Sequence, residues 1–171
     1  MREVLEKKLD ENFPFMKKER TLSEQKNENN YISDLYHGLS CGDGWYNLVH
    51  DLCTEIMEAY KEAGREIDIE IYQIKEKFGT LRFYYGFKSQ PRRIQGFDFI
   101  GIQGVGGVRI TPRENGFEKK ISDIVRKYEK MSAEVCEICG KPGRLRKDLN
   151  WIRTCCDGCY IIEKIGNREH K

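Results

Sequence analysis

The sequence predicts an α+β fold, with a helix and an antiparallel hairpin as its core and a treble-clef-like zinc unit at the C-terminus. Apolar residues recur at helical spacing over residues 45–63 and alternate with polar residues over residues 67–71 and 80–85. Near the C-terminus, 16 residues separate two Cys-x2-Cys pairs, a spacing typical of zinc sites. The four cysteines are Cys136, Cys139, Cys156 and Cys159.

The composition suits one main domain with a small appendage. Of the 171 residues, 39% are hydrophobic and 34% are charged, and the net charge of +2 does not by itself indicate a surface for duplex nucleic acid. No apolar run reaches the length of a membrane span, and the charged N-terminus lacks the apolar segment of a signal peptide. We therefore expect a cytoplasmic protein without a membrane partner. In that reducing compartment, paired cysteines favour a metal over disulfides.

Residues 1–35 are expected to form an N-terminal arm and linker. Residues 2–11 predict a short helix with Val4, Leu5 and Leu9 on one side. The following Phe-Pro-Phe sequence (residues 13–15) should end this helix and dock on the rest of the protein. Polar residues dominate the stretch after it, which is typical of a linker or of an excursion from the fold.

The helix over residues 45–63 is the best-defined element of the sequence. Its apolar stripe continues for about five turns, enough for it to act as the central packing element. Asp43 is expected to cap its N-terminus, since a short side-chain oxygen at that position accepts a backbone N–H. Gly64 is the residue type that commonly follows a helix C-terminus.

Two strands and a second helix complete the predicted core, residues 36–133. Residues 67–71 form the first strand, residues 75–79 a polar connection and residues 80–85 the second strand. A hairpin laid on the long helix is the economical arrangement of these elements. Residues 117–131 again carry a helical apolar stripe and lead the chain to the cysteine unit.

A glycine-rich insert, residues 86–116, separates the second strand from the second helix. It carries five basic residues against two acidic residues. Gly104, Gly106 and Gly107 precede Arg109, and backbone N–H groups next to a guanidinium would suit an anion. The segment matches neither the Walker pattern nor a dinucleotide fingerprint, so a flexible hairpin tip remains the alternative interpretation.

Arg82 and Tyr84 lie on the polar face of the second predicted strand. A guanidinium and an aromatic ring could grip a nucleotide through charge-assisted hydrogen bonds and stacking. The alternative is a cross-strand pair on a solvated face.

The C-terminal unit, residues 134–171, is predicted to consist of a knuckle, a small hairpin and a helix that carries the second cysteine pair. Four thiolates fill the coordination shell of a zinc ion, which favours one structural Zn²⁺ per chain. The pairing with Cys159 favours Cys156 over Cys155 as a ligand, although Cys155 stays an alternative. We expect that the protein is not an enzyme, because no catalytic arrangement of residues is recognisable in the sequence.

Three sequence blocks together resemble a family of small uncharacterised phage and prophage proteins. The blocks are Cys-Gly-Asp-Gly-Trp at 41–45, Lys-Glu-Lys-Phe-Gly-Thr-Leu-Arg-Phe-Tyr at 75–84, and Cys-Glu-Ile-Cys-Gly at 136–140 followed by Trp-Ile-Arg-Thr-Cys-Cys-Asp. The resemblance implies a zinc site and a viral setting, and it brings no activity with it. The insert at 86–116 is longer than the family pattern.

These observations lead to two functional expectations. The first is a non-enzymatic phage or prophage accessory protein that binds and sequesters an anionic nucleotide-type ligand, such as a bacterial immune signal. Arg82, Tyr84, Arg109 and the three insert glycines (Gly104, Gly106 and Gly107) would form that site. The second is an adaptor that binds nucleic acid or a host protein through the zinc unit. That unit is close to neutral once two charges are counted for the metal-bound thiolates, which weakens its case as a phosphate-binding surface.

Overall fold

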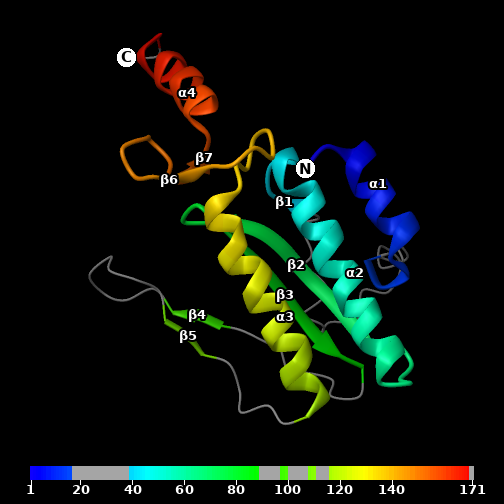
Figure 1. The fold of residues 1–171 in the computed structure, drawn as a ribbon. Coiled ribbons are helices and arrows are strands. Elements are labelled where there is room, and N and C mark those ends of the chain that lie inside the picture. The colour runs from blue at the N-terminus through cyan, green and yellow to red at the C-terminus, as the bar shows by residue number, and fades with distance from the viewer. Residues whose placement is uncertain (17–38, 89–96, 100–107, 111–115, 170–171) are drawn as a thin grey trace, which may run out of the picture.

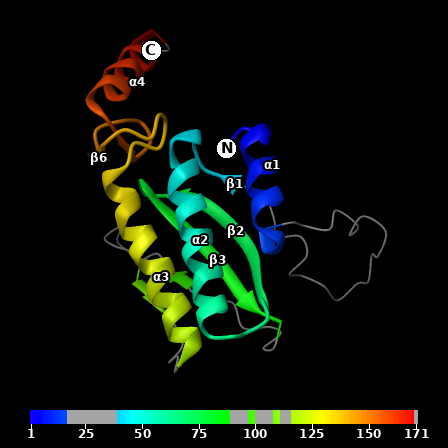
Figure 2. The ribbon, with the colours of Figure 1, turned by 45° about the vertical axis from the view of Figure 1, so that its right-hand side comes forward.

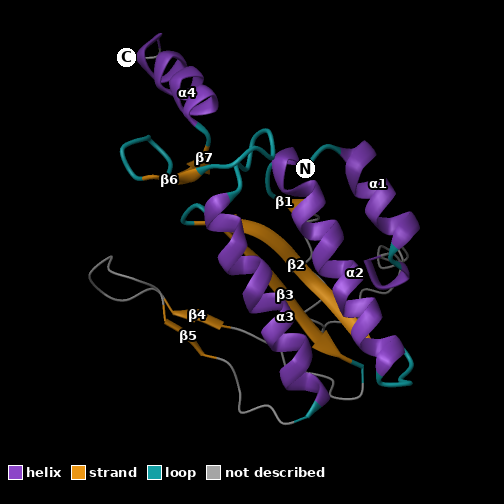
Figure 3. Ribbon diagram, viewed as in Figure 1, coloured by secondary structure: helices purple, strands orange, loops and turns teal. Residues whose placement is uncertain are grey.

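Two helices cover one face of a three-stranded sheet in the computed structural model (Figure 1). The helices are α2 (Tyr46–Glu62) and α3 (Phe117–Met131), and they lie side by side. The structure describes residues 1–16, 39–88, 97–99, 108–110 and 116–169. Helices and small sheets alternate along the chain, which confirms the predicted α+β class (Figure 3).

The sheet consists of β1 (Leu39–Ser40), β2 (Ile69–Lys77) and β3 (Thr80–Phe87) in that order. Strand β1 pairs with β2 in parallel, whereas β2 and β3 form an antiparallel hairpin. The buried faces of α2 and of the hairpin meet in one core that includes Trp45, Ile56 and Phe83, each fully buried. The predicted packing of a hairpin on a long helix is thus confirmed.

The N-terminal segment joins this core. It forms α1 (Glu3–Asn12) and a short 3₁₀ helix at Pro14–Met16, and its buried side chains are Leu9, Phe13 and Met16. The N-terminal ammonium donates a 2.7 Å hydrogen bond to the carbonyl oxygen of Leu39, which ties the start of the chain to β1. Val4 is 66% exposed, so it does not share the buried side predicted for it.

The N-terminus of the long helix differs from the prediction. Residues Asp43–Trp45 form a 3₁₀ turn before α2, and no side chain caps either element. The Asp43 carboxylate instead accepts a 2.7 Å hydrogen bond from the backbone N–H of Arg2, and it pairs with the Arg2 side chain. The C-terminal prediction is correct, since Gly64 follows α2 with a φ of +60°.

The predicted boundaries of the hairpin are wrong. Strand β2 runs through the stretch assigned to a polar connection, and a two-residue turn at Phe78–Gly79 replaces that connection. The cause is a β-bulge between Ile71 and Gln73, which breaks the alternation and hides the continuation of the strand.

Helix α3 and Ser132, the residue after it, also close the free edge of β3. The backbone N–H of Leu81 donates a 2.8 Å hydrogen bond to Ser132 Oγ, and that of Phe83 donates a 2.9 Å bond to Glu129 Oε1. Exposed strand edges invite pairing with other chains, so these side chains protect the edge as well as hold the helix.

Two further two-stranded sheets lie outside the core. Strands β4 (Phe97–Phe99) and β5 (Val108–Ile110) pair within the predicted insert. Strands β6 (Arg144–Arg146) and β7 (Arg153–Cys155) pair next to α4 (Asp157–Glu169). Figure 2 shows α4 projecting beyond the layers formed by the core helices and the sheet. None of the helices that the structure describes is long and apolar enough to cross a membrane.

Candidate metal centre and the adjoining sheet face

Four cysteine sulfurs gather at the base of the C-terminal unit. The Sγ atoms of Cys136, Cys139, Cys156 and Cys159 all lie within 4.8 Å of one another. They are the four residues predicted from the sequence as ligands.

The first pair sits in a tight turn, the knuckle, whose backbone is fixed by short hydrogen bonds. The N–H of Gly140 donates a 2.8 Å hydrogen bond to the Cys136 carbonyl oxygen, and the N–H of Cys136 donates a 2.7 Å hydrogen bond to the Lys141 carbonyl oxygen. Gly140 adopts a φ of +76°, a left-handed conformation that residues with a side chain rarely adopt. The Cys-x2-Cys-Gly sequence therefore turns tightly enough to direct both sulfurs to one side.

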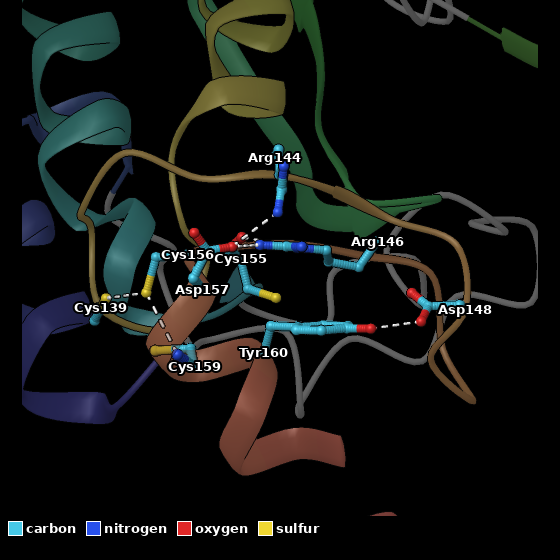
Figure 4. Close-up of polar contacts among 9 residues, drawn as sticks. All are labelled: Cys139, Arg144, Arg146, Asp148, Cys155, Cys156, Asp157, Cys159 and Tyr160. Atoms are coloured by element: carbon cyan, nitrogen blue, oxygen red, sulfur yellow. Dashed lines mark hydrogen bonds and ion pairs between the residues drawn. The ribbon is translucent and has the colours of Figure 1, made fainter.

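The second pair comes from the start of α4. Cys156 precedes the helix and Cys159 lies in its first turn, where the Cys159 N–H donates a 3.4 Å hydrogen bond to Cys156 Sγ. Thiolates are stabilised at a helix N-terminus, where unpaired N–H groups and the helix dipole favour negative charge. Cys155 ends β7 and is fully buried, and its sulfur points away from the other three cysteines that Figure 4 shows.

The donor set fits a tetrahedral zinc ion. The Sγ atoms of Cys139 and Cys156 lie 3.7 Å apart. Two ligands of a tetrahedral site with Zn–S bonds of about 2.3 Å are separated by about 3.8 Å. Four soft sulfur donors fill the shell and leave no position for a reacting water, which is typical of a structural metal ion. The four cysteines can thus hold a metal ion.

A surface network orients α4 against the β6–β7 hairpin (Figure 4). The Tyr160 ring lies 4.3 Å from the Arg146 guanidinium, and its hydroxyl donates a 2.5 Å hydrogen bond to Asp148. Lys164 Nζ lies 2.7 Å from the same carboxylate, and these two hydrogen bonds lower the pKa of Asp148 to about 2. Arg144 and Arg146 both pair with Asp157 at the first residue of the helix.

The knuckle docks on the segment that precedes α2. The N–H of Gly44 donates a 2.8 Å hydrogen bond to the Glu137 carbonyl oxygen, and the N–H of Gly42 donates a 2.9 Å bond to the Glu137 carboxylate. A Cβ at Gly44 would lie 2.2 Å from the Cys136 carbonyl oxygen, so only glycine permits this approach. The two glycines of the Cys-Gly-Asp-Gly-Trp block therefore serve the junction with the metal unit.

The β6–β7 hairpin docks on the turn between β2 and β3. Thr154 Oγ1 donates a 2.6 Å hydrogen bond to the Gly79 carbonyl oxygen, and Trp151 Nε1 donates a 2.7 Å bond to Glu76. Leu145 fills the space beside Gly79, where a Cβ would lie 2.2 Å from its Cδ1 atom. The three sequence blocks thus meet in one place, around the cysteine cluster.

Glu137 is a residue of this junction that the sequence analysis did not single out. It lies between the two knuckle cysteines and is 5% exposed. Burial raises the pKa of its carboxyl group, while the Gly42 N–H and Arg153, 3.5 Å away, act in the opposite direction. The sequence offers one signal for it, an acidic residue inside a Cys-x2-Cys motif, and that signal is weak.

A second feature lies on the face of the β2–β3 hairpin away from the helices. Residues paired across an antiparallel ladder share a face, so Lys75 lies beside Arg82 and Gln73 beside Tyr84. Lys75 Nζ lies 5.1 Å from the centre of the Tyr84 ring. Arg82 Nη1 donates hydrogen bonds to Thr80 Oγ1 at 2.6 Å and to the Leu81 carbonyl oxygen at 2.9 Å, which fixes the guanidinium.

The bulge in β2 adds an aromatic residue to this face. Tyr72 lies across the sheet over Gly86, where a Cβ would be 2.3 Å from the tyrosine hydroxyl oxygen. Bulges often redirect a side chain in this way next to functional sites. The face therefore combines two tyrosines with a lysine and an arginine.

The predicted ligand residues fall into two groups. The structure places Arg82 and Tyr84 on one sheet face, as predicted. The backbone of Arg109 lies in β5 opposite Asp98, and Gly104, Gly106 and Gly107 lie outside the described residues. The contribution of the insert to a site stays a prediction.

Comparison of this chain with protein-family models, with curated proteins and with solved structures gives no match. The functional assignment therefore rests on the residues and their geometry.

Proposed function

We propose that this chain is a non-enzymatic binding protein whose C-terminal unit is stabilised by one structural zinc ion. Cys136, Cys139, Cys156 and Cys159 would hold the ion, which supplies a cross-link between the knuckle and α4 and takes no part in chemistry. The proposal is supported by the all-sulfur donor set and by the contacts that surround it.

The proposed ligand is an anion of the nucleotide type, bound at the outer face of the β2–β3 hairpin. The observation that carries this proposal is the cluster of Lys75, Arg82 and Tyr84 on one face. Aromatic rings on a sheet face stack nucleobases, and neighbouring cations bind phosphate. Arg109 and the insert glycines Gly104, Gly106 and Gly107 stay part of the proposed site.

The resemblance to phage and prophage proteins supports a biological setting for such a site. We propose that the protein acts in the cytoplasm of a host cell and sequesters a nucleotide signal of host immunity. Sequestration requires binding without turnover, and the proposed site is accordingly assigned no catalytic residue.

Calorimetric titration with cyclic and linear nucleotides tests this function. The wild-type protein should bind at least one of them, and Tyr84→Leu should weaken that binding by about tenfold or more, since stacking contributes on the order of 1–3 kcal/mol per base. Arg82→Gln should also weaken it. Lys119→Gln, which removes an exposed charge on α3, is the matched control and should bind normally. Normal binding by Tyr84→Leu and Arg82→Gln would exclude this face as the site.

A second candidate function is an adaptor that contacts a host protein or nucleic acid through the zinc unit. The observation in its favour is the exposure of three isoleucines on α4, namely Ile161, Ile162 and Ile165 at 55%, 70% and 55%. They lie opposite Tyr160 and Lys164, which face the hairpin. Crosslinking to a host protein that is lost in Ile162→Glu, together with an absence of nucleotide binding, would favour the adaptor.

A further inference from the structure

The β2–β3 hairpin carries two pairs of a lysine and an aromatic ring. The first pair is Lys75 and Tyr84, with 5.1 Å between the ammonium nitrogen and the ring centre. The second is Lys77 and Phe78, with a corresponding distance of 5.7 Å. We propose that each pair is a subsite for one nucleotide and that the ligand therefore contains two linked nucleotide units. This inference rests on the proposed function and adds the size of the ligand to it.

The two subsites are related by the strand itself. Lys75 and Lys77 are two residues apart in β2, so their side chains leave the same face about 6.6 Å apart. Their ladder partners on this face are Arg82 and Thr80. The paired residues from Gln73–Tyr84 to Lys77–Thr80 on this face include three cations, a charge that suits phosphate groups, and Glu70 lies farther along the same face, beside Tyr72.

The conformation of Phe78 indicates that its ring serves an external contact. Phe78 and Gly79 have φ values of +54° and +78°, so both central residues of the turn are left-handed, as in a type I′ turn. Asparagine suits the first of these positions, whereas a bulky side chain there is an uncommon and costly choice. Phe78 is 48% exposed and is not part of the core, so packing in the core does not explain it.

The zinc unit holds this turn in place. Thr154 donates to the Gly79 carbonyl oxygen, and Leu145 packs against Gly79 from β6. The N–H of Gly79 also donates a 2.5 Å hydrogen bond to Glu76 Oε1. The other carboxylate oxygen of Glu76, Oε2, accepts a hydrogen bond from Trp151 Nε1. The Phe78 ring is thus presented from a fixed turn, which lowers the ordering cost of a ligand contact.

Titration with ligands of increasing length tests the proposal. The probes are a mononucleotide, the linear dinucleotide of the same base and an octanucleotide. The dinucleotide should bind about tenfold or more tightly than the mononucleotide, since a second stacked base is added. A further gain for the octanucleotide, beyond the increase expected from its greater number of overlapping sites, would identify single-stranded nucleic acid as the source of the ligand. A gain no larger than this statistical increase would identify a free dinucleotide.

The variant Phe78→Asn separates this subsite from the stability of the fold. Asparagine relieves the left-handed strain, so the melting temperature should rise by about 2–4 °C. At the same time, the dinucleotide should lose its advantage over the mononucleotide. Val4→Asn replaces an exposed apolar residue on α1 and is the matched control, for which the advantage should persist.

The possible results separate the two-subsite proposal from the proposed nucleotide binding on which it rests. Mononucleotide binding that depends on Tyr84, without a gain for the dinucleotide, would overturn the two-subsite proposal and leave the proposed function in place. A dinucleotide advantage that survives in Phe78→Asn would also overturn it. An absence of binding by all three probes would overturn both.

Discussion

Trp45 Nε1 donates a 2.8 Å hydrogen bond to the carbonyl oxygen of Val135, the residue just before the first cysteine of the cluster. The two residues are 90 positions apart in the chain. Trp45 is fully buried and immediately precedes α2, so this bond joins the entry of the core helix to the entry of the metal unit. The cysteine unit is therefore built onto the core at its base, even though α4 extends away from it.

Gly44→Ala should destabilise the protein because the added methyl group has no room. Its Cβ would lie 2.2 Å from the Cys136 carbonyl oxygen and 2.5 Å from the Gly140 nitrogen, both of which are backbone atoms. We expect a loss of about 1–3 kcal/mol in the free energy of unfolding, measured by urea denaturation. Gly166→Ala is the matched control, because nothing lies within 4 Å of that position in α4. The control should raise helix stability by about 0.5–1 kcal/mol. Equal changes in the free energy of unfolding for the two substitutions would contradict the close contact between Gly44 and the knuckle.

Ser132→Ala should destabilise the edge of β3. The Ser132 hydroxyl accepts the buried Leu81 N–H, so its removal leaves that donor without a partner and should cost about 1–3 kcal/mol. Hydrogen exchange measured by NMR provides the local check. The Leu81 amide should exchange faster in the variant, while the Phe83 amide, which is bonded to Glu129, should change less. Unchanged protection at Leu81 would argue against this contact.

Cys41 should resist alkylation in the folded protein. Burial raises the pKa of its thiol from an ordinary value of 9.0 to about 12. The thiolate is the reactive form, so at pH 8 its population should be roughly a thousandfold below that of a free cysteine. Mass spectrometry after treatment with iodoacetamide should find Cys41 modified in denaturant but not in the native state. Rapid native modification would show that the Cys41 region opens readily.

The sequence predicts those features whose signal is local. The apolar stripe of α2 and the spacing of the cysteine pairs are both contained in short stretches, and the structure shows the helix and brings the four sulfurs together. The continuation of β2 was missed, because the bulge places Tyr72 and Gln73 on the same face and breaks the alternation. Strand β1 is only two residues long and pairs with residues 35 positions later, so no local pattern reveals it.

The roles of the glycines were also beyond sequence reasoning. The glycines at 42 and 44 suggest a tight turn, yet the structure uses them for close approach to the knuckle. That requirement depends on contacts about 90 residues away. For the same reason, the carboxylate of Asp43 binds Arg2 and not the helix N-terminus, since the competing partner comes from a distant part of the chain.

The central claim is that Cys136, Cys139, Cys156 and Cys159 bind one metal ion in the C-terminal unit. Measuring the metal content of the protein and its variants tests this claim most directly. Elemental analysis of protein purified without added metal should find one zinc ion per chain in the wild type and in Cys155→Ser, whose sulfur lies outside the cluster. Cys156→Ser removes one of the four clustered sulfurs and should lose the ion. A full complement of zinc in Cys156→Ser, or its loss in Cys155→Ser alone, would contradict the ligand set and the treble-clef arrangement of the unit.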